Sequence, residues 1–256
     1  MTINVLLVGE SWSSTAVHAK GYDIFHSTTF HTGADAFVRA LQEGERFRIT
    51  WMKAHEAAEG FPFERAGLDR FGAVILSDVG ANTLLLPPQV WLHGRPMPNR
   101  LKLLRDWCAD GGGLMMVGGY LTFQGIDGRA RWRRTPVEEA LPVSLLPYDD
   151  RLEVPEGFAP RALLPAHPIL AGIEGAWPLL LGANEVAPKP GAEVLLTLPD
   201  AEGGHPLLVA GTHGRGRTLA WTSDIGPHWL PDAFSAWDGF GRLFRQGVGW
   251  LCEGRG

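Results

Sequence analysis

One stretch limits the folds open to this chain more than any other: an apolar run bounded by glycines, residues 111–125. The stretch begins with three glycines, Gly111 to Gly113, which can end a preceding helix. Leu114–Val117 is then a short apolar run typical of a buried strand. The turn Gly118-Gly119-Tyr120 follows directly. A strand that enters such a turn has the local geometry of a nucleophile elbow, which presents one side chain at the carboxyl edge of a parallel sheet. The pattern therefore predicts Tyr120 at that edge.

Other apolar runs in the first half of the chain are also expected to be buried strands, with helices between them. Residues 4–9 and 72–78 are apolar at nearly every position, as strands buried on both faces are, and residues 47–52 alternate. Helices are expected between the strands, at residues 33–43, 63–69 and 99–109, whereas prolines make residues 82–97 a loop or a broken helix. The alternation predicts an α/β fold: a doubly wound, mostly parallel sheet with helices on both faces.

The second half of the chain has weaker signals. Residues 142–178 contain several prolines, and we expect antiparallel strands there that cover one edge of the sheet. Further strands are expected at residues 193–198, 206–212 and 218–222, the last two joined as a hairpin by a glycine-rich turn, with helices at residues 135–141 and 237–252. We interpret residues 1–256 as a single domain with an insertion-like region at about 126–190.

Composition excludes several classes of protein. The chain has 256 residues, 45% of them hydrophobic, enough for a large core. A formal net charge of −5 argues against nucleic acid or an anionic membrane as the partner, and no apolar run is long enough to span a bilayer. Only two cysteines occur, far apart, so the expected compartment is the cytoplasm and a disulfide framework is not expected.

Polar residues follow four of the expected parallel strands. Ligands bind at the carboxyl edge of such sheets, where loops and helix N-termini converge. Four side chains are candidates for acid–base or other catalytic roles: Glu10, Asp78, Tyr120 and His228. Candidate ligand-binding residues beside them are Ser11, Trp12, His18, Lys20, Ser77, Thr122 and Asp224. Structural roles remain open for each group: capping for Glu10, an Asx-turn for Asp78, a buried phenol for Tyr120 and an ordinary surface loop for His228.

Residues 10–32 form a polar stretch with several histidines, which we expect to be a long loop after the first strand. Loops of this length are often functional. His18 and Lys20 in it are suited to bind an anionic group of a substrate. The histidines of the region lack a compact metal-ligand spacing, so neither a metal nor another cofactor is predicted.

Taken together, these landmarks resemble the class I glutamine amidotransferase-like superfamily, in its branch of unassigned activity, and more distantly the ThuA-like proteins of trehalose utilisation. The resemblance rests on four segments, namely Val8-Gly9-Glu10-Ser11-Trp12 with residues 18–25, Leu76-Ser77-Asp78-Val79-Gly80, Gly118 to Gly125, and Gly214 to Arg217 with Thr222-Ser223-Asp224. It implies a flavodoxin-like fold over essentially the whole chain, and self-association into a homo-oligomer. The ThuA-like relatives imply a sugar-derived ligand, for which tryptophan faces are suitable.

The elbow departs from the superfamily's pattern. Active members resemble Gly-Xaa-Cys-Xaa-Gly there, whereas this chain has Tyr120 at the position of the cysteine. Glutamine hydrolysis needs an activated nucleophile such as a thiolate, and a phenol with a pKa near 10 is a poor substitute. The first hypothesis is therefore a protein without glutaminase chemistry that binds a small polar metabolite, as a binding protein or as an enzyme of unassigned reaction. A structural or regulatory oligomeric subunit is the second hypothesis, and an active glutamine amidotransferase is the third.

Overall fold

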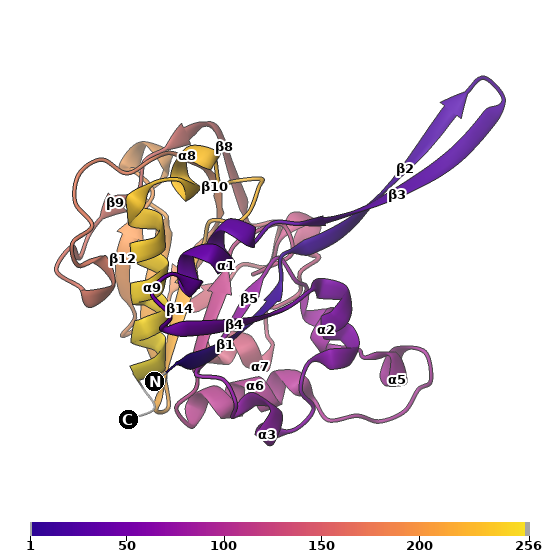
Figure 1. The fold of residues 1–256 in the computed structure, drawn as a ribbon, viewed down its shortest axis with the longest axis horizontal. Coiled ribbons are helices and arrows are strands. Elements are labelled where there is room, and N and C mark those ends of the chain that lie inside the picture. The colour runs from indigo at the N-terminus through magenta and orange to yellow at the C-terminus, as the bar shows by residue number, and fades with distance from the viewer. Residues whose placement is uncertain (1, 254–256) are drawn as a thin grey trace.

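A computed structural model describes residues 2–253 and has a mostly parallel, eight-stranded sheet at its centre (Figure 1). The parallel strands lie in the order β4 (Phe47–Met52), β1 (Ile3–Gly9), β5 (Ala73–Ser77), β6 (Gly113–Val117) and β14 (Gly216–Trp221). The antiparallel strands β13 (Pro206–His213), β12 (Glu193–Thr197) and β9 (Arg161–Ala162) extend the sheet beyond β14. The parallel strands follow the flavodoxin-like order 2-1-3-4-5, which confirms the predicted fold class.

The apolar runs form these strands because the sheet has a core on each face. In β1, Val5 and Leu7 pack into one core while Leu6 and Val8 pack into the other, and all four side chains are fully buried. Consecutive apolar residues are therefore needed, instead of alternation with polar ones. Residues 193–222 form antiparallel strands that include the predicted hairpin of β13 and β14.

Helices cover both faces of the sheet. The first core contains side chains of α1 (Asp35–Gln42) and α9 (Asp238–Cys252), which lie together in Figure 1. The second core contains side chains of five helices: α2 (Ala54–Gly60), α3 (Arg65–Leu68), α4 (Ala81–Leu85), α6 (Arg100–Ala109) and α7 (Pro136–Ala140). Thr135 caps α7, because its hydroxyl accepts a hydrogen bond from Glu138 N. The proline-rich segment after α4 contains only the short α5 (Pro88–Trp91), and α8 (Asp232–Ser235) precedes α9.

The region we expected to cover one sheet edge does so only in part. β9 alone pairs with the sheet, at its antiparallel end. β7 (Val143–Leu145) pairs with β11 (Val186–Pro188), and β8 (Arg151–Phe158) pairs with β10 (Leu180–Asn184), each as a separate two-stranded unit. Within residues 2–253, no helix is both long enough and apolar enough to cross a membrane.

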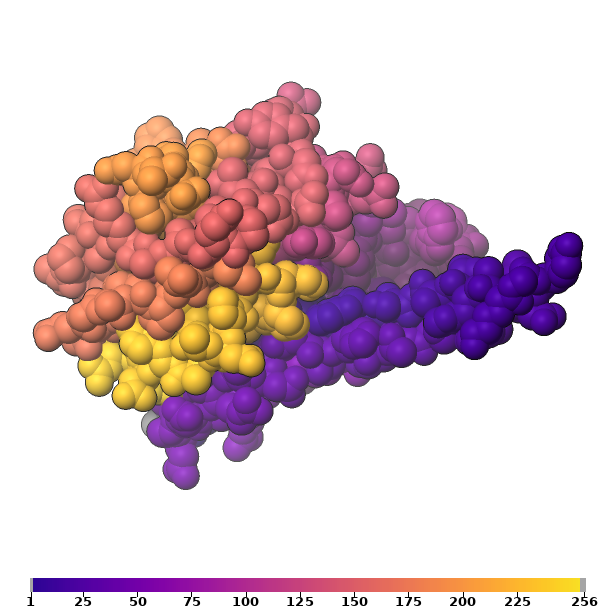
Figure 2. Space-filling view, turned by 90° about the horizontal axis from the view of Figure 1, so that it is seen from above, coloured from indigo at the N-terminus to yellow at the C-terminus, as the bar shows by residue number. Residues whose placement is uncertain are grey.

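The expectation of a long loop at residues 10–32 is wrong. This segment is a β-hairpin, β2 (Ser11–Lys20) and β3 (Asp23–Thr32), which projects from the body of the molecule (Figures 1 and 2). Its strands could not be predicted from the sequence pattern, because neither face of the ribbon packs on the core and the sequence therefore lacks a regular apolar alternation. We call residues 11–32 the arm.

The backbone at Gly118, where the elbow begins, leaves no room for a side chain, and two substitutions test this packing. A Cβ on Gly118 would lie 2.0 Å from the carbonyl oxygen of Thr222, so Gly118→Ala must push β6 and β14 apart. We expect a loss of about 3 kcal/mol, or a melting temperature lower by about 6–12 °C. The matched control is Gly247→Ala in α9, where the new Cβ would lie 3.5 Å from Leu219. Alanine there should stabilise the protein by up to about 1 kcal/mol, because it favours the helix.

Thermal unfolding of both variants beside the parent protein measures the difference. Equal melting temperatures for the two alanine variants would contradict the close approach of the strands at the elbow.

Candidate functional site

The carboxyl ends of four parallel strands meet at one edge of the sheet. Glu10 follows β1, Asp78 follows β5, Tyr120 follows β6 and Asp224 follows β14. Glu10 and Asp78 have φ values of +50° and +42°, a left-handed conformation that costs a non-glycine residue energy and is often found at functional sites. The edge thus brings together side chains that are more than 200 positions apart in the chain.

Glu10 is fully buried. Its Oε2 accepts a hydrogen bond of 2.6 Å from the hydroxyl of Ser77, the last residue of β5. Its Oε1 has no hydrogen-bond partner among residues 2–253. Gly33 and Gly226 enclose Oε1 so closely that a Cβ on either would lie within 2.4 Å of it. The two glycines therefore make the space in which this carboxyl is seated.

Asp224 is the second fully buried carboxyl. Its Oδ1 accepts hydrogen bonds from the backbone N–H groups of Ile225, at 2.7 Å, and Gly226, at 3.0 Å. Its Oδ2 has no hydrogen-bond partner among residues 2–253, although the Nδ1 atom of His228 lies 3.5 Å away. His228 has a φ of +103°, so the loop holds its ring beside Asp224 in a strained backbone conformation.

Burial controls the electrostatics of these carboxyls. Loss of water raises the pKa of Glu10 well above its ordinary value, and the nearby Asp224 and Asp78 raise it further. Burial likewise raises the pKa of Asp224 well above its ordinary value, with a further rise from Asp78. The pKa of Asp78 is also raised by burial, against the opposing effect of backbone hydrogen bonds. Such a group of acids retains protons at pH values where exposed carboxyls are ionised, as general acid–base chemistry requires.

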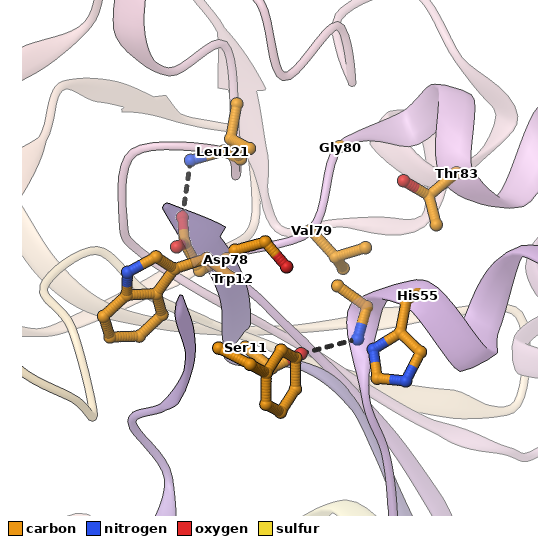
Figure 3. Close-up of a pocket in the computed structure, with 11 residues that line it drawn as sticks. Ser11, Trp12, His55, Asp78, Val79, Gly80, Thr83 and Leu121 are labelled. Atoms are coloured by element: carbon orange, nitrogen blue, oxygen red, sulfur yellow. Dashed lines mark hydrogen bonds between the residues drawn. The ribbon is translucent and has the colours of Figure 1, made fainter. Parts of the chain in front are cut away.

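Asp78 also closes the elbow turn. Its Oδ1 accepts a hydrogen bond of 2.7 Å from the backbone N–H of Leu121, the residue that follows Tyr120 (Figure 3). In a nucleophile elbow, the N–H that follows the nucleophile stabilises the oxyanion of the reaction. Here a carboxyl of the same chain occupies that donor.

Two residues that the sequence reading missed hold the other side of the turn. The N–H of Gly119 donates to Oδ1 of Asn184 at 3.0 Å, and Nδ2 of Asn184 donates to the carbonyl of Gly119 at 3.2 Å and to Oδ1 of Asp150 at 2.8 Å. Asp150 is buried and also accepts the N–H groups of Gln124 and Gly125, each at 2.8 Å. The one available sequence signal was Asn184 itself, a polar amide that ends the apolar strand β10.

Tyr120 lies against aromatic and cationic groups instead of standing free. Its ring stacks on His228, with centroids 4.8 Å apart, and the guanidinium of Arg151 lies 4.8 Å from the ring centroid. Burial raises the pKa of Tyr120 above its ordinary value, so the phenol is a still weaker nucleophile. Burial also raises the pKa of the Cys108 thiol to about 12, inside α6 and away from the turn.

A pocket of about 330 Å³ opens beside this edge, between the base of the arm and the loop after β5 (Figure 3). Its wall combines aromatic faces with hydroxyl, imidazole and carboxyl groups. The lining residues are Ser11, Trp12, Ser13, Phe30, Ala54, His55, Asp78, Val79, Gly80, Thr83 and Leu121. The position fits the general rule that ligands bind where the order of an open α/β sheet reverses, here between β1 and β5.

The structure brings together most of the predicted site residues but not all. Ser11, Trp12 and Asp78 line the pocket. Ser77 donates to the buried carboxyl of Glu10, Asp224 is itself a buried carboxyl, and Thr122 is buried in the elbow turn. The remaining two lie far out on the arm: His18 stacks on Phe25 with centroids 4.4 Å apart, and Lys20 flanks the turn at the tip. Within residues 2–253, no three histidine, cysteine, aspartate or glutamate side chains are grouped so that they could hold a metal ion.

The raised pKa of Asp224 predicts how stability depends on pH. A carboxyl whose pKa is raised in the folded state stabilises the fold below its unfolded pKa, about pH 4, and this contribution is lost as pH rises through the folded value. Asp224→Asn removes the titration while an amide oxygen still accepts the two backbone N–H groups. We expect the variant to melt above the parent protein at pH 8, with the difference shrinking toward pH 4.

Asp200→Asn is the matched control, since Asp200 is an exposed partner of Arg161. Melting temperatures of all three proteins between pH 4 and 8 provide the comparison. Parallel curves for the parent protein and Asp224→Asn would contradict the burial of an ionisable carboxyl at this edge.

Known protein families and solved structures include close matches to this chain and its fold. The family model described as "Putative glutamine amidotransferase" matches residues 4–253. The solved structure of the cytoplasmic protein STM3548 from Salmonella typhimurium is 36% identical, with a TM-score of 0.91 over 96% of this chain and 98% of that one. Cytoplasmic protein STM1381 from Salmonella typhimurium LT2 is 34% identical, with a TM-score of 0.91 over 97% of this chain and 99% of that one.

More distant structures share the fold alone. A ThuA-like protein from Bacteroides uniformis is 12% identical, with a TM-score of 0.57 over 97% of this chain and 91% of that one. A search of the curated proteins finds no match. The family match over nearly the whole chain, together with the flavodoxin-like sheet and its elbow after β6, shows that this protein belongs to the GATase1_like family of glutamine amidotransferase-like proteins.

Proposed function

We propose that this protein binds a small polar metabolite in the pocket at the carboxyl edge of its sheet and does not hydrolyse glutamine. The observation that carries the proposal is the pocket wall: Trp12 and Phe30 line it together with a carboxyl, an imidazole and several hydroxyls, beside a group of buried acids. Both relatives from Salmonella are described as cytoplasmic proteins, which supports a cytoplasmic location for this one.

The pocket's chemistry favours a hydroxyl-rich ring such as a sugar or a sugar acid. Aromatic faces pack on the C–H surface of such a ring, while Asp78, His55 and Thr83 can hydrogen-bond to its hydroxyls. A volume of about 330 Å³ is suitable for a ligand of monosaccharide size. Of the three candidate acid–base residues, Asp78 lines the pocket, whereas Glu10 and His228 lie outside its lining. Burial raises the pKa of Glu10 well above its ordinary value, which suits a general acid.

Two features argue against glutaminase chemistry. Tyr120 replaces the expected thiol, and its ring is stacked on His228. The backbone donor next to it, the N–H of Leu121, is bound to Asp78. A developing oxyanion at the elbow would therefore have to displace a carboxyl at 2.7 Å.

A structural or regulatory subunit is the second candidate function. The arm favours it, because an exposed ribbon with apolar side chains is unusual unless something covers it. The two functions are compatible, since the base of the arm is also a wall of the pocket.

A thermal-shift screen of monosaccharides, sugar acids and polyols tests ligand binding. A ligand at 100 times its dissociation constant stabilises the folded state by about 2.7 kcal/mol, which raises the melting temperature by about 5–10 °C. Trp12→Ala should remove at least nine-tenths of the affinity for any compound that stabilises the parent protein. Tyr148→Ala, which removes an exposed aromatic outside the pocket lining, should leave the affinity unchanged. An equal loss of affinity in both variants, or an affinity that is unchanged in Trp12→Ala, would contradict the proposed site.

Ammonia release from glutamine tests the exclusion of glutaminase activity. The parent protein should release none above the buffer rate. Tyr120→Cys should release none either, because Asp78 still occupies the N–H of Leu121. Turnover by Tyr120→Cys that is lost on thiol alkylation would show that the nucleophile alone was missing and that the donor is free.

A further inference from the structure

The arm is the largest feature of the molecule that neither the fold nor the proposed ligand site explains. Its two strands pair along ten residues each, from Ser11↔Thr32 to Lys20↔Asp23, which gives a ribbon roughly 30 Å long. Figures 1 and 2 both show its outer half standing clear of the body. Every residue of β3 is exposed, so the core of the molecule does not hold this strand.

Several large apolar side chains of the arm are exposed among its serines, threonines and histidines. Val17, Ile24, Phe25 and Phe30 are each at least 50% exposed, and Tyr22 at the tip is fully exposed. Directly paired residues share a face of the ribbon, so Val17, Phe30 and Ile24 with its partner Ala19 lie on the same face. Exposed apolar side chains gathered on one face of a projecting ribbon mark an interaction surface.

The arm also lacks the sequence features that usually prevent exposed strand edges from pairing with other molecules. Residues 11–32 contain no proline, and their only lysine, arginine, aspartate or glutamate residues are Lys20 and Asp23 at the tip. Natural edge strands are usually protected by charges, prolines or bulges. A two-stranded hairpin is at best marginally stable alone in water, so a partner that covers this one would supply the missing stabilisation.

A second group of exposed apolar side chains lies at α5. Trp91 and Leu92, in and after α5, are 72% and 65% exposed, and Leu86 just before α5 is 37% exposed. Figure 1 shows α5 and the tip of the arm well apart, with the arm pointing away from α5. The arm of one molecule thus does not cover its own α5, and both apolar surfaces are left open to another molecule (Figure 1).

We propose that the arm docks on the α5 segment, residues 86–92, of a second copy of this chain, and that the exchange is reciprocal. A two-fold pair would bury both apolar arms and both α5 segments in one isologous interface. The apolar side chains of each arm offer on the order of 600 Å². Two arms together with the surfaces that receive them reach the range of about 1,200–2,000 Å² found in stable complexes.

This assembly would also organise the pocket. Trp12, Ser13 and Phe30 at the base of the arm line it on one side, and Thr83 of α4, which leads into the α5 segment, lines it on the other. A partner that holds the arm and α5 in place therefore fixes two walls of the ligand site. The inference goes beyond ligand binding and does not depend on which metabolite the pocket takes.

Sedimentation velocity and light scattering of the full chain test the proposal. The parent protein should be a dimer, or an assembly of dimers, at micromolar concentration. An arm-shortened variant, in which Asn-Gly replaces residues 15–28 between the paired Ser14 and Thr29, should be a folded monomer. Leu163→Asp changes an exposed leucine outside the arm and α5, and it should leave the mass unchanged. A monomeric parent protein, including one that binds vesicles through its arm, would overturn the proposal.

Point variants separate the two halves of the contact. Ile24→Asp in the arm and Trp91→Asp in α5 should each weaken self-association by at least tenfold, with circular dichroism unchanged. Mixing these two variants should restore dimers at a concentration where each alone is monomeric. The mixed pair retains one intact contact: the unaltered arm of the Trp91→Asp chain on the unaltered α5 of the Ile24→Asp chain. A mixture that stays monomeric, or a Trp91→Asp variant with the parent mass, would overturn the assignment of α5 as the receiving surface.

Discussion

The buried carboxyl of Glu10 is the contact on which the edge of the sheet depends. The backbone N–H of Glu10 donates to the carbonyl of Ser77 at 2.8 Å, and the backbone carbonyl of Glu10 accepts from the N–H of Gly33 at 3.1 Å. The Glu10 carboxyl accepts a hydrogen bond from the Ser77 hydroxyl. One residue thus joins the end of β1, the end of β5 and the point where the arm returns to the body. Gly226 brings the loop after β14 against the same carboxyl. The arm, the pocket and the acid group all take their positions from this junction.

The elbow after β6 keeps the position that the family gives it but has different chemistry. Asn184 and Asp150 fix the turn from one side and Asp78 fixes it from the other, so its backbone groups serve stability. The ring of Tyr120 completes a stack with His228 and Arg151. The carboxyls whose pKa values burial raises, Glu10 and Asp224, lie at the neighbouring strand ends and not in the turn.

The sheet could be predicted from the sequence because its strands are buried on both faces. Runs such as Val5–Val8 and Leu114–Val117 have no other plausible place in a fold of this size, and the polar residues that end them must meet at one edge. The chain order then places Glu10, Asp78 and Asp224 together. These inferences need only local pattern and the right-handedness of crossovers.

The arm and the inner support of the elbow could not be predicted in the same way. The arm has no face on the core, so the period-2 alternation that identifies a strand is absent. The prediction that His18 and Lys20 bind an anionic group depends on a loop beside the site, and both residues lie far out on the arm instead. Its turn, Gly21-Tyr22 between two threonine- and serine-rich strands, was the one available signal. Asn184 reaches Gly119 across 65 positions, and no local rule connects them.

The protonation state of Glu10 tests the central claim most directly. Carbon-13 NMR of protein labelled at the glutamate carboxyls, with the Glu10 resonance identified by its absence in Glu10→Gln, follows this group through a pH titration. A carboxyl seated between Gly33 and Gly226 and bonded to Ser77 should hold its proton well above the range in which exposed glutamates ionise. A Glu10 resonance that titrates with the exposed glutamates, near pH 4, would show that water reaches the carboxyl and would contradict the account of this edge as a buried acid site.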